Sequence, residues 1–305
     1  MTRRLAAGSL LVVATLCVGL GACGGDDEQA KRGERLGIPR QADPAHERRL
    51  ARLVKVCSWA PGFGGAPVRG LRGFDLVVVD GVRQKDGTVD MGPAGVRALR
   101  RGGALVLSYL SVGTLERWRH YATPRAYRWA LRAVDGWPGE RYVDARNRGW
   151  RRLMRTEALR LRRAGFDGLY LDNVDVAEVY PRTRPGLIRL VRNLRQAVPG
   201  LLLVQQNGLV VVEAVPTDAI AHEDVWWRWN GRYRRSPPAE TSRVLRRLRA
   251  LHAEGLPVFT LDYARRGSPA VQQVVSRSLA EGFHPAVSLV DLAAPPHGTP
   301  PCRSG

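Results

Sequence analysis

The sequence predicts an α/β fold, a (β/α)8 TIM barrel, from two observations. Eight short hydrophobic runs recur along the 305 residues, and each is nearly continuous, as expected for strands that are buried on both faces. Segments with a helical spacing of apolar residues lie between the runs, and such alternation of strands and helices is typical of a parallel sheet. An open doubly wound sheet is the alternative, because eight strands do not exclude it.

The elements follow in order along the chain. The predicted strands cover residues 55–59, 75–81, 103–113, 166–173, 201–208, 218–224, 257–264 and 284–291. The clearest predicted helices cover 147–165, 184–200, 239–257 and 268–283. The first connection, 60–73, is glycine-rich, and no helical pattern follows the last strand. The ring of outer helices is therefore expected to be incomplete, with the segment 43–54 as a candidate to cover the gap.

The amino terminus has the features of a targeting segment. Arg3 and Arg4 precede an apolar run that ends at Leu20, followed by small residues and Cys23. This resembles a bacterial lipobox, so we expect a signal peptide over 1–23 with lipidation at Cys23, a flexible tether over 24–48 and a single domain over 49–305. The protein is then lipid-anchored outside the cytoplasm on the bacterial membrane. An ordinary cleaved signal and a secreted protein are the alternative.

Two further cysteines, Cys57 and Cys302, lie in the exported part of the chain. Export permits a disulfide, and the first and last strands of a closed barrel are neighbours, so a bridge between them is one expectation and two free thiols the other. The sequence has no CxxC motif, no His/Cys cluster, no phosphate loop and no dinucleotide fingerprint. We therefore expect neither a metal nor a cofactor.

The formal net charge is +20, and nearly all of the positive charge is arginine. The arginines are scattered over predicted helices, without a basic run or interleaved aromatic residues, so the pattern does not favour nucleic-acid binding. We expect a monomer. An envelope anchor that binds anionic polymer through these arginines is one alternative function.

Acidic residues stand where two of the predicted strands end. If Leu169 and Leu171 face the helices, Asp172 points inward at the carboxyl-terminal mouth of the barrel. Glu223 is likewise the last inward position of strand 218–224. Barrel enzymes place their chemistry at this rim, and two carboxyl groups across one opening favour glycoside hydrolysis. We expect an ionised Asp172 and a protonated Glu223.

Other strands also end in polar residues. Any one of them is explained as a loop start or helix cap, but their recurrence favours a shared site. Three tryptophans follow Glu223, either as a sugar platform or as packing between loops. The rim candidates for substrate contact are Asp80, Tyr109, Asn207, Trp227, Asp262 and Tyr263.

Four blocks, "YLSVGTLERWR", "ERYVDAR", "GFDGLYLDNVD" and "AHED", resemble glycoside hydrolase family 114 in this order. The resemblance runs from about Lys55 to Asp291 and implies a barrel glycosidase, similar to endo-α-1,4-polygalactosaminidases, that uses Asp172 and Glu223 as its catalytic pair. It implies hydrolysis of galactosamine or N-acetylgalactosamine polymers with retention. It also adds Glu116, Asn173 and Asp175 as candidate substrate contacts.

Two alternatives remain open at this point. Glu116 and Arg119 lie in one predicted loop and are candidates for a purely structural pair. The whole chain is alternatively a noncatalytic glycan-binding lipoprotein on a degenerate barrel, although both acids of the proposed pair are present.

Overall fold

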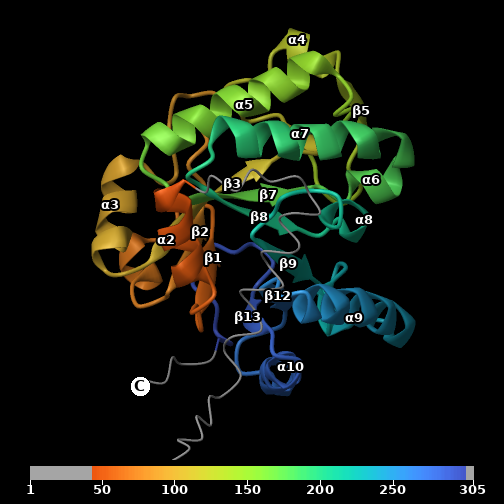
Figure 1. The fold of residues 1–305 in the computed structure, drawn as a ribbon. Coiled ribbons are helices and arrows are strands. Elements are labelled where there is room, and N and C mark those ends of the chain that lie inside the picture. Colours follow the sequence, from red (N-terminus) through yellow and green to blue (C-terminus); the bar gives the residue numbers. More distant parts are fainter. Residues whose placement is uncertain (1–42, 300–305) are drawn as a thin grey trace, which may run out of the picture.

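The computed structural model describes residues 43–299, and its centre is a single parallel sheet curled into a nearly closed barrel (Figure 1). The eight strands lie in chain order around the barrel, which confirms the predicted fold. Their bounds are β1 Trp59–Gly62, β2 Leu76–Val79, β3 Leu105–Ser111, β7 Gly168–Asp172, β8 Leu202–Gln206, β9 Ala219–Glu223, β12 Val258–Tyr263 and β13 His284–Ser288.

The barrel is completed by contacts between its first and last strands. Within residues 43–299 no strand ladder joins β1 to β13. The Phe63 N–H instead donates to the Leu292 carbonyl at 2.9 Å, and Trp59 Nε1 donates to the His284 carbonyl at 3.0 Å. These two bonds hold the seam together.

Helices surround the barrel unevenly. Beyond the amino-terminal helix, the long ones are α3 Pro93–Arg101, α5 Arg148–Arg163, α7 Arg184–Ala197, α9 Pro238–Ala253 and α10 Pro269–Ala280. α5 and α7 lie side by side over β3, β7 and β8 (Figure 1). The connection after β1 contains only the short 3-10 turn η1 Val68–Leu71, and no helix follows β13 in the described part of the chain. The helical ring is incomplete, as expected.

The amino-terminal helix α2, Pro44–Leu53, begins before the predicted domain boundary at residue 49. Asp43 caps it by accepting the Ala45 N–H at 2.8 Å. His46 contacts Asp218 at 2.8 Å, and Leu53 packs among the side chains of the barrel interior. Residues 44–48 are thus part of the domain rather than of the tether. Residues 1–42, including Cys23, lie outside the described residues.

The first strand differs from its prediction. β1 begins at Trp59, where the predicted strand ends, because the N–H groups of Cys57 and Ser58 both donate to Oδ2 of Asp75 at 3.0 Å. Cys57 therefore precedes the strand. It is disulfide-bonded, and the other cysteines of the chain lie outside the described residues, so pairing with Cys302 stays a prediction.

The alternation of side chains along the strands follows the sequence prediction. Leu169 and Leu171 of β7 pack in the outer core beneath α5 and α7, whereas Tyr170 faces the barrel interior. In β9, Ile220 faces the helices and the flanking alanines face the interior. The last inward positions of these strands therefore open onto the carboxyl-terminal mouth.

Two small sheets that the sequence did not predict are added to the barrel. A three-stranded antiparallel sheet consists of β4 Thr114–Glu116, β5 Ala130–Ala133 and β6 Glu140–Val143. A hairpin consists of β10 Trp227–Trp229 and β11 Tyr233–Arg235. Short helical turns α4 Pro124–Tyr127, α6 Val176–Val179, η2 Pro181–Thr183 and α8 Leu209–Val212 complete the described elements. Among residues 43–299, no helix has the length and apolar character needed to cross a bilayer.

Candidate active site

Asp172 and Glu223 stand at the mouth of the barrel, each as the final residue of its strand. Asp172 ends β7 and Glu223 ends β9, with only β8 between them. Neighbouring strands are about 4.8 Å apart, so the two backbones lie about 10 Å from each other across one strand. Both side chains are partly buried, and the charge of Glu223 raises the pKa of Asp172. The two predicted acids therefore stand at one opening, close enough for the charge of Glu223 to act on Asp172.

The surroundings of Asp172 disfavour its charged form. Burial raises its pKa well above the usual range, and the charges of Glu223 and Asp175 raise it further. The opposing influence is hydrogen bonding, which includes Nδ2 of Asn173 donating to Oδ2 of Asp172 at 3.0 Å. Desolvation and two acidic neighbours thus disfavour the ionised form of Asp172.

Glu223 is held by two hydrogen-bond donors. Nδ2 of Asn207 donates to its Oε2 at 3.0 Å, and the Tyr263 hydroxyl donates to its Oε1. Donors to both oxygens stabilise a carboxylate. An ionised Asp172 was expected from the sequence, whereas burial and the neighbouring acids raise its pKa.

Three residues that directly follow inner strands have left-handed backbone conformations. The φ angles are 60° for Asn173, 53° for Asn207 and 59° for Asp224. Asn and Asp tolerate this region better than other non-glycine residues, and such strain often accumulates at functional sites. Two of these residues come immediately after the acids, so the chain turns sharply just where each carboxyl group must project into the mouth.

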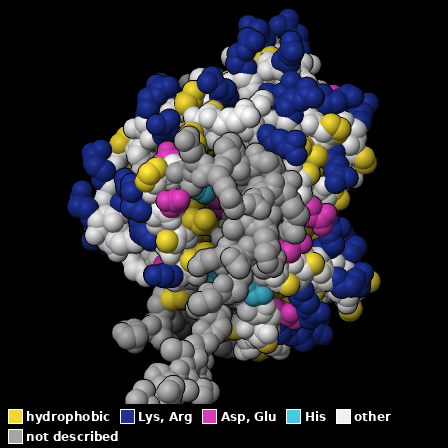
Figure 2. All heavy atoms as spheres, viewed as in Figure 1, with side chains coloured by type: hydrophobic (Ala, Val, Ile, Leu, Met, Phe, Trp, Pro, Cys, Tyr) yellow, Lys and Arg dark blue, Asp and Glu magenta, His cyan; other side chains and the backbone are white. Residues whose placement is uncertain are grey.

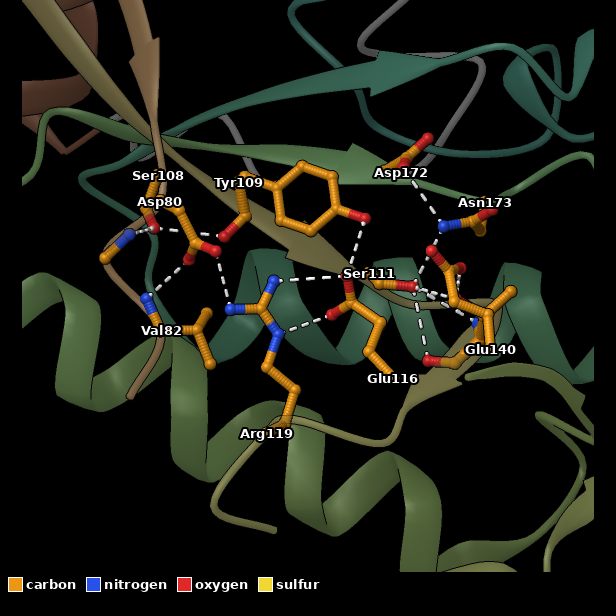
Figure 3. A network of polar contacts seen from close by, with 12 residues as sticks. Asp80, Val82, Ser108, Tyr109, Ser111, Glu116, Arg119, Glu140, Asp172 and Asn173 are labelled. Carbon is orange, nitrogen blue, oxygen red and sulfur yellow. Dashed lines mark hydrogen bonds and ion pairs between the residues drawn. The ribbon is translucent and has the colours of Figure 1, made fainter. Parts of the chain in front are cut away.

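One side of the mouth is supported by a buried arginine (Figure 3). Arg119 is 2% exposed and donates to Asp80 Oδ2 at 2.6 Å and to Glu116 Oε2 at 2.5 Å. The Tyr109 hydroxyl donates to Glu116 Oε1 at 3.3 Å. Both carboxylates are thus engaged by one guanidinium, which is the structural pairing that the sequence left open. Asp80 and Glu116 are thus held in place from within the protein, and their contact with substrate stays a prediction.

A chain of hydrogen bonds runs from Asp172 into the three-stranded sheet (Figure 3). Asn173 Nδ2 donates to Ser111 Oγ at 3.0 Å, and Ser111 Oγ lies 2.7 Å from Thr114 Oγ1. Thr114 Oγ1 donates to Oε2 of Glu140 at 3.0 Å. Burial, with the charge of Glu116, raises the pKa of Glu140 to about 7. Sequence reasoning missed this chain because its far end lies in the unpredicted sheet.

On the opposite side of the mouth, Asp262 of β12 holds the start of a loop in place. Its Oδ1 accepts the N–H groups of Trp226 at 2.6 Å and Trp227 at 2.7 Å, which fixes the start of the β10–β11 hairpin. Its Oδ2 is buried and has no hydrogen-bond partner among residues 43–299, and burial raises its pKa to about 7. Burial thus disfavours the charged form of Asp262, while its Oδ1 holds the start of the hairpin.

The three tryptophans after Glu223 have different roles. Trp226 is buried and donates through Nε1 to Ser278 Oγ at 2.9 Å, so it packs between the loop and α10. Trp227 is partly buried against the same core. Trp229 is 38% exposed, and its ring centroid lies 4.6 Å from that of Tyr233 across the hairpin. Trp229 and Tyr233 are therefore the pair suited to stacking against a sugar ring, whereas the sequence singled out Trp227 of the three tryptophans as the substrate contact.

Further groups complete the mouth. The Tyr170 hydroxyl is buried without a hydrogen-bond partner in the described part of the chain, and the charges of Glu223 and Asp172 help to raise its pKa. Burial raises the pKa of Asp175 to about 6 and that of Asp224 to about 8, with Glu223 as the main charged contributor in both. The alternation along β7 could have identified Tyr170, since it shares the inward face with Asp172. Within residues 43–299, no group of three His, Cys, Asp or Glu side chains is arranged to hold a metal ion.

Comparison with known proteins gives a consistent set of matches. The model of glycoside-hydrolase family GH114 matches residues 46–299. An uncharacterized protein of Deinococcus radiodurans is 30% identical over 234 residues, which cover 70% of this chain and 72% of the relative. An uncharacterized protein of Thermotoga maritima is 22% identical over 221 residues, covering 66% and 68%.

Two solved structures share the fold. The glycoside hydrolase domain of PelA from Pseudomonas aeruginosa is 25% identical with a TM-score of 0.69, covering 80% of this chain and 100% of that domain. Ega3 from Aspergillus fumigatus, solved in complex with galactosamine, is 18% identical with a TM-score of 0.64, covering 78% of this chain and 94% of that one.

Proposed function

The chain belongs to glycoside hydrolase family 114 and is a glycoside hydrolase, and from this premise we propose that it cleaves galactosamine-containing polysaccharide with Asp172 and Glu223 as its catalytic pair. The observation that carries the proposal is the position of these two acids at the ends of β7 and β9, where the charge of Glu223 raises the pKa of Asp172 at the mouth of the barrel. The likeness to Ega3, which was solved with galactosamine, supports the choice of sugar.

The charge of the mouth fits an amino sugar. Although the whole chain has a net charge of +20, the mouth gathers Asp172, Asp175, Glu223 and Asp224, and their mutual repulsion contributes to raised pKa values. A protonated amine placed among these groups relieves that repulsion, because nearby charges act more strongly than distant, screened ones. Galactosamine binding therefore favours ionisation of the acids.

We propose the retaining reaction that the resemblance to family 114 implies for this pair of carboxyl groups. One protonates the glycosidic oxygen as the bond to the anomeric carbon breaks, and the other attacks that carbon from the opposite face, forming a glycosyl-enzyme that water then hydrolyses with retention. The Asn207 and Tyr263 donors hold Glu223, and Asn173 holds Asp172, so neither carboxyl group has to be oriented during the reaction. The Trp229–Tyr233 pair of the hairpin offers a surface for the sugar next to the reacting one.

The first test is substitution of each acid by its amide. Asp172→Asn and Glu223→Gln should each lower kcat by about a thousandfold or more on a partly acetylated galactosamine polymer, with an unchanged unfolding midpoint. Reducing ends report the rate, and NMR of the first product anomer reports retention. A wild-type protein that retains the polymer without producing reducing ends is instead the noncatalytic glycan binder.

A second test separates the free amine from its acetylated form. Titration calorimetry of galactosamine near pH 6.5 in buffers of different ionisation heat should show proton release, because the bound ammonium lowers the pKa values of the mouth. N-acetylgalactosamine, which is neutral, should release far fewer protons. Equal release by both sugars would contradict the proposed role of the acidic groups.

We also propose that the enzyme is tethered to the membrane through a lipid on Cys23, on the basis of the apolar run and small residues that precede it. Replacing Cys23 with Ala should move the protein from the membrane fraction to the soluble fraction of the producing cell. Cys17→Ala, within the same segment, is the matched control and should leave the fractionation unchanged.

A further inference from the structure

A cavity of about 540 Å³ lies on the shoulder of the barrel, outside the catalytic mouth. Its walls come from α6, the start of α7, α8 and α9. α6 follows the turn after Asp172, and α8 follows the turn at Asn207, so part of the lining comes from the segments that directly follow β7 and β8. A volume of this size accommodates a ligand of one or two sugar rings.

Four arginines line this cavity, and the charge is poorly compensated. They are Arg184 at the start of α7 and Arg243, Arg246 and Arg247 of α9, against a single lining carboxylate, Glu178. Arg247 is held in place by Glu213 at 2.5 Å and by the Leu209 carbonyl at 3.2 Å. The other three arginines form no ion pair with any carboxylate of residues 43–299. The cavity thus presents guanidinium groups that are available to a ligand.

Positive charge alone does not distinguish this place, since basic side chains are spread over the outer helices (Figure 2). A second cavity, of about 250 Å³ at the other end of the barrel, also has arginines in its lining. There, however, Arg49 and Arg100 are both paired with the buried Asp167, at 3.1 and 3.2 Å. Its third arginine, Arg162, has no ion pair within residues 43–299, but the larger cavity has about twice the volume and three such arginines.

The charge of one of these arginines acts on His222 of β9. His222 precedes Glu223 on β9, and its Nδ1 lies 2.7 Å from the Glu223 carbonyl oxygen. Its pKa is lowered to about 4, mainly by burial and in part by the charge of Arg243. Arg243 is therefore close enough for its charge to affect the pKa of His222 on β9. The cavity that Arg243 lines is nevertheless separate from the mouth.

The lining defines the chemistry of the ligand. Guanidinium groups match the geometry of carboxylate and phosphate oxygens, and Ala177, Leu209 and Val210 supply an apolar wall for a ring. A protonated amino sugar is repelled here, so the cavity does not extend the galactosamine site. We propose that it binds an acidic saccharide unit, a sugar ring that carries a carboxylate or a phosphate, and so holds the enzyme on an anionic glycan while the mouth acts elsewhere.

The test measures binding without hydrolysis, so its result is independent of the proposed catalytic function. Trigalacturonate and galactose 6-phosphate are titrated into the wild-type protein and into the double variant Arg243→Ala/Arg246→Ala, with neutral galactotriose and inorganic phosphate as comparison ligands. We expect at least one of the two acidic saccharides to bind, and the double variant to weaken it about tenfold or more. Arg249→Ala, an exposed arginine of the same helix outside the cavity, is the matched control and should bind like wild type.

Each outcome decides the proposal. Trigalacturonate binding alone identifies a carboxylated glycan, and galactose 6-phosphate binding alone identifies a phosphorylated one. Absence of measurable binding of either up to millimolar concentration overturns the site, as does an equal loss of affinity in Arg249→Ala, which would indicate general charge attraction. Inorganic phosphate binding as tightly as the saccharides overturns the assignment of a sugar ring to the apolar wall.

Discussion

Asn207 and Glu223 form a reciprocal pair of hydrogen bonds between the ends of β8 and β9. Asn207 Nδ2 donates to Glu223 Oε2, and the Glu223 N–H donates to Asn207 Oδ1, both at 3.0 Å. One amide side chain therefore fixes both the backbone and the carboxyl group of Glu223. The left-handed backbone of Asn207, with φ 53°, is what turns this amide towards β9.

Removal of the Asn207 amide should lower catalysis more than it lowers stability. Asn207→Gly keeps the left-handed turn but loses both hydrogen bonds, and we expect kcat to fall about tenfold to a hundredfold, the cost of a bond to a charged group. Asn207→Ala should lose the same activity and in addition unfold about 1 kcal/mol more easily than the glycine variant. Steady-state kinetics and urea unfolding of the two variants separate the roles. Wild-type kcat in Asn207→Gly would contradict the positioning of Glu223.

The charge of Asp175 should be visible in the pH dependence of the reaction. It raises the pKa of Asp172, so Asp175→Asn should lower that pKa and move one limb of the kcat/KM profile to lower pH. If Asp172 acts as the proton donor, the basic limb moves; if it acts as the nucleophile, the acidic limb moves. The profile thus also assigns the two roles.

Asp135→Asn removes an exposed carboxylate that pairs with Arg132 and is the matched control for this experiment. Its profile should overlay that of the wild type. Limbs that stay in place in Asp175→Asn, or that move to higher pH, would show that the two carboxyl groups are not coupled in the free enzyme.

Much of the fold could be predicted because buried parallel strands read as continuous apolar runs, and because the alternation of Leu169, Tyr170 and Leu171 fixes the direction of Asp172. The small sheets could not be predicted, because three-residue strands such as β4 carry no detectable period. Contacts in the site between residues far apart in the chain could also not be predicted from the sequence. The pairing of Glu116 with Arg119 was one alternative offered by the sequence, but Arg119 also bonds Asp80, which lies far away in the chain, and no local pattern indicates that contact.

Loss of Arg119 should destabilise the protein strongly. Arg119→Met leaves the buried carboxylates of Asp80 and Glu116 without their guanidinium, and breaking a buried ion pair in this way costs about 3–5 kcal/mol. Arg117→Ala, an exposed arginine of the same loop, should change the free energy of unfolding by less than about 0.5 kcal/mol. Urea denaturation monitored by tryptophan fluorescence measures both. Similar midpoints for the two variants would mean that the Arg119 network does not support the wall of the mouth.

Asp262 should make the protein less stable as the pH rises. Its pKa is raised to about 7 in the folded protein from an ordinary value of 3.8, so between these values the folded state holds a proton that the unfolded state has lost. The free energy of unfolding contributed by this group therefore falls as the pH rises towards 7 and levels off above it. Asp262→Asn keeps an acceptor for the N–H groups of Trp226 and Trp227 but cannot titrate.

Chemical denaturation at pH 5, 6, 7 and 8 tests this linkage. Between pH 5 and 7 the wild type should lose about 2 kcal/mol more stability than Asp262→Asn, and above pH 7 the two curves should run parallel. Asp135→Asn, on the surface, should follow the wild type throughout. Parallel curves for wild type and Asp262→Asn over the whole range would place the proton on another group, and the hairpin that carries Trp229 would then be held by a charged Asp262.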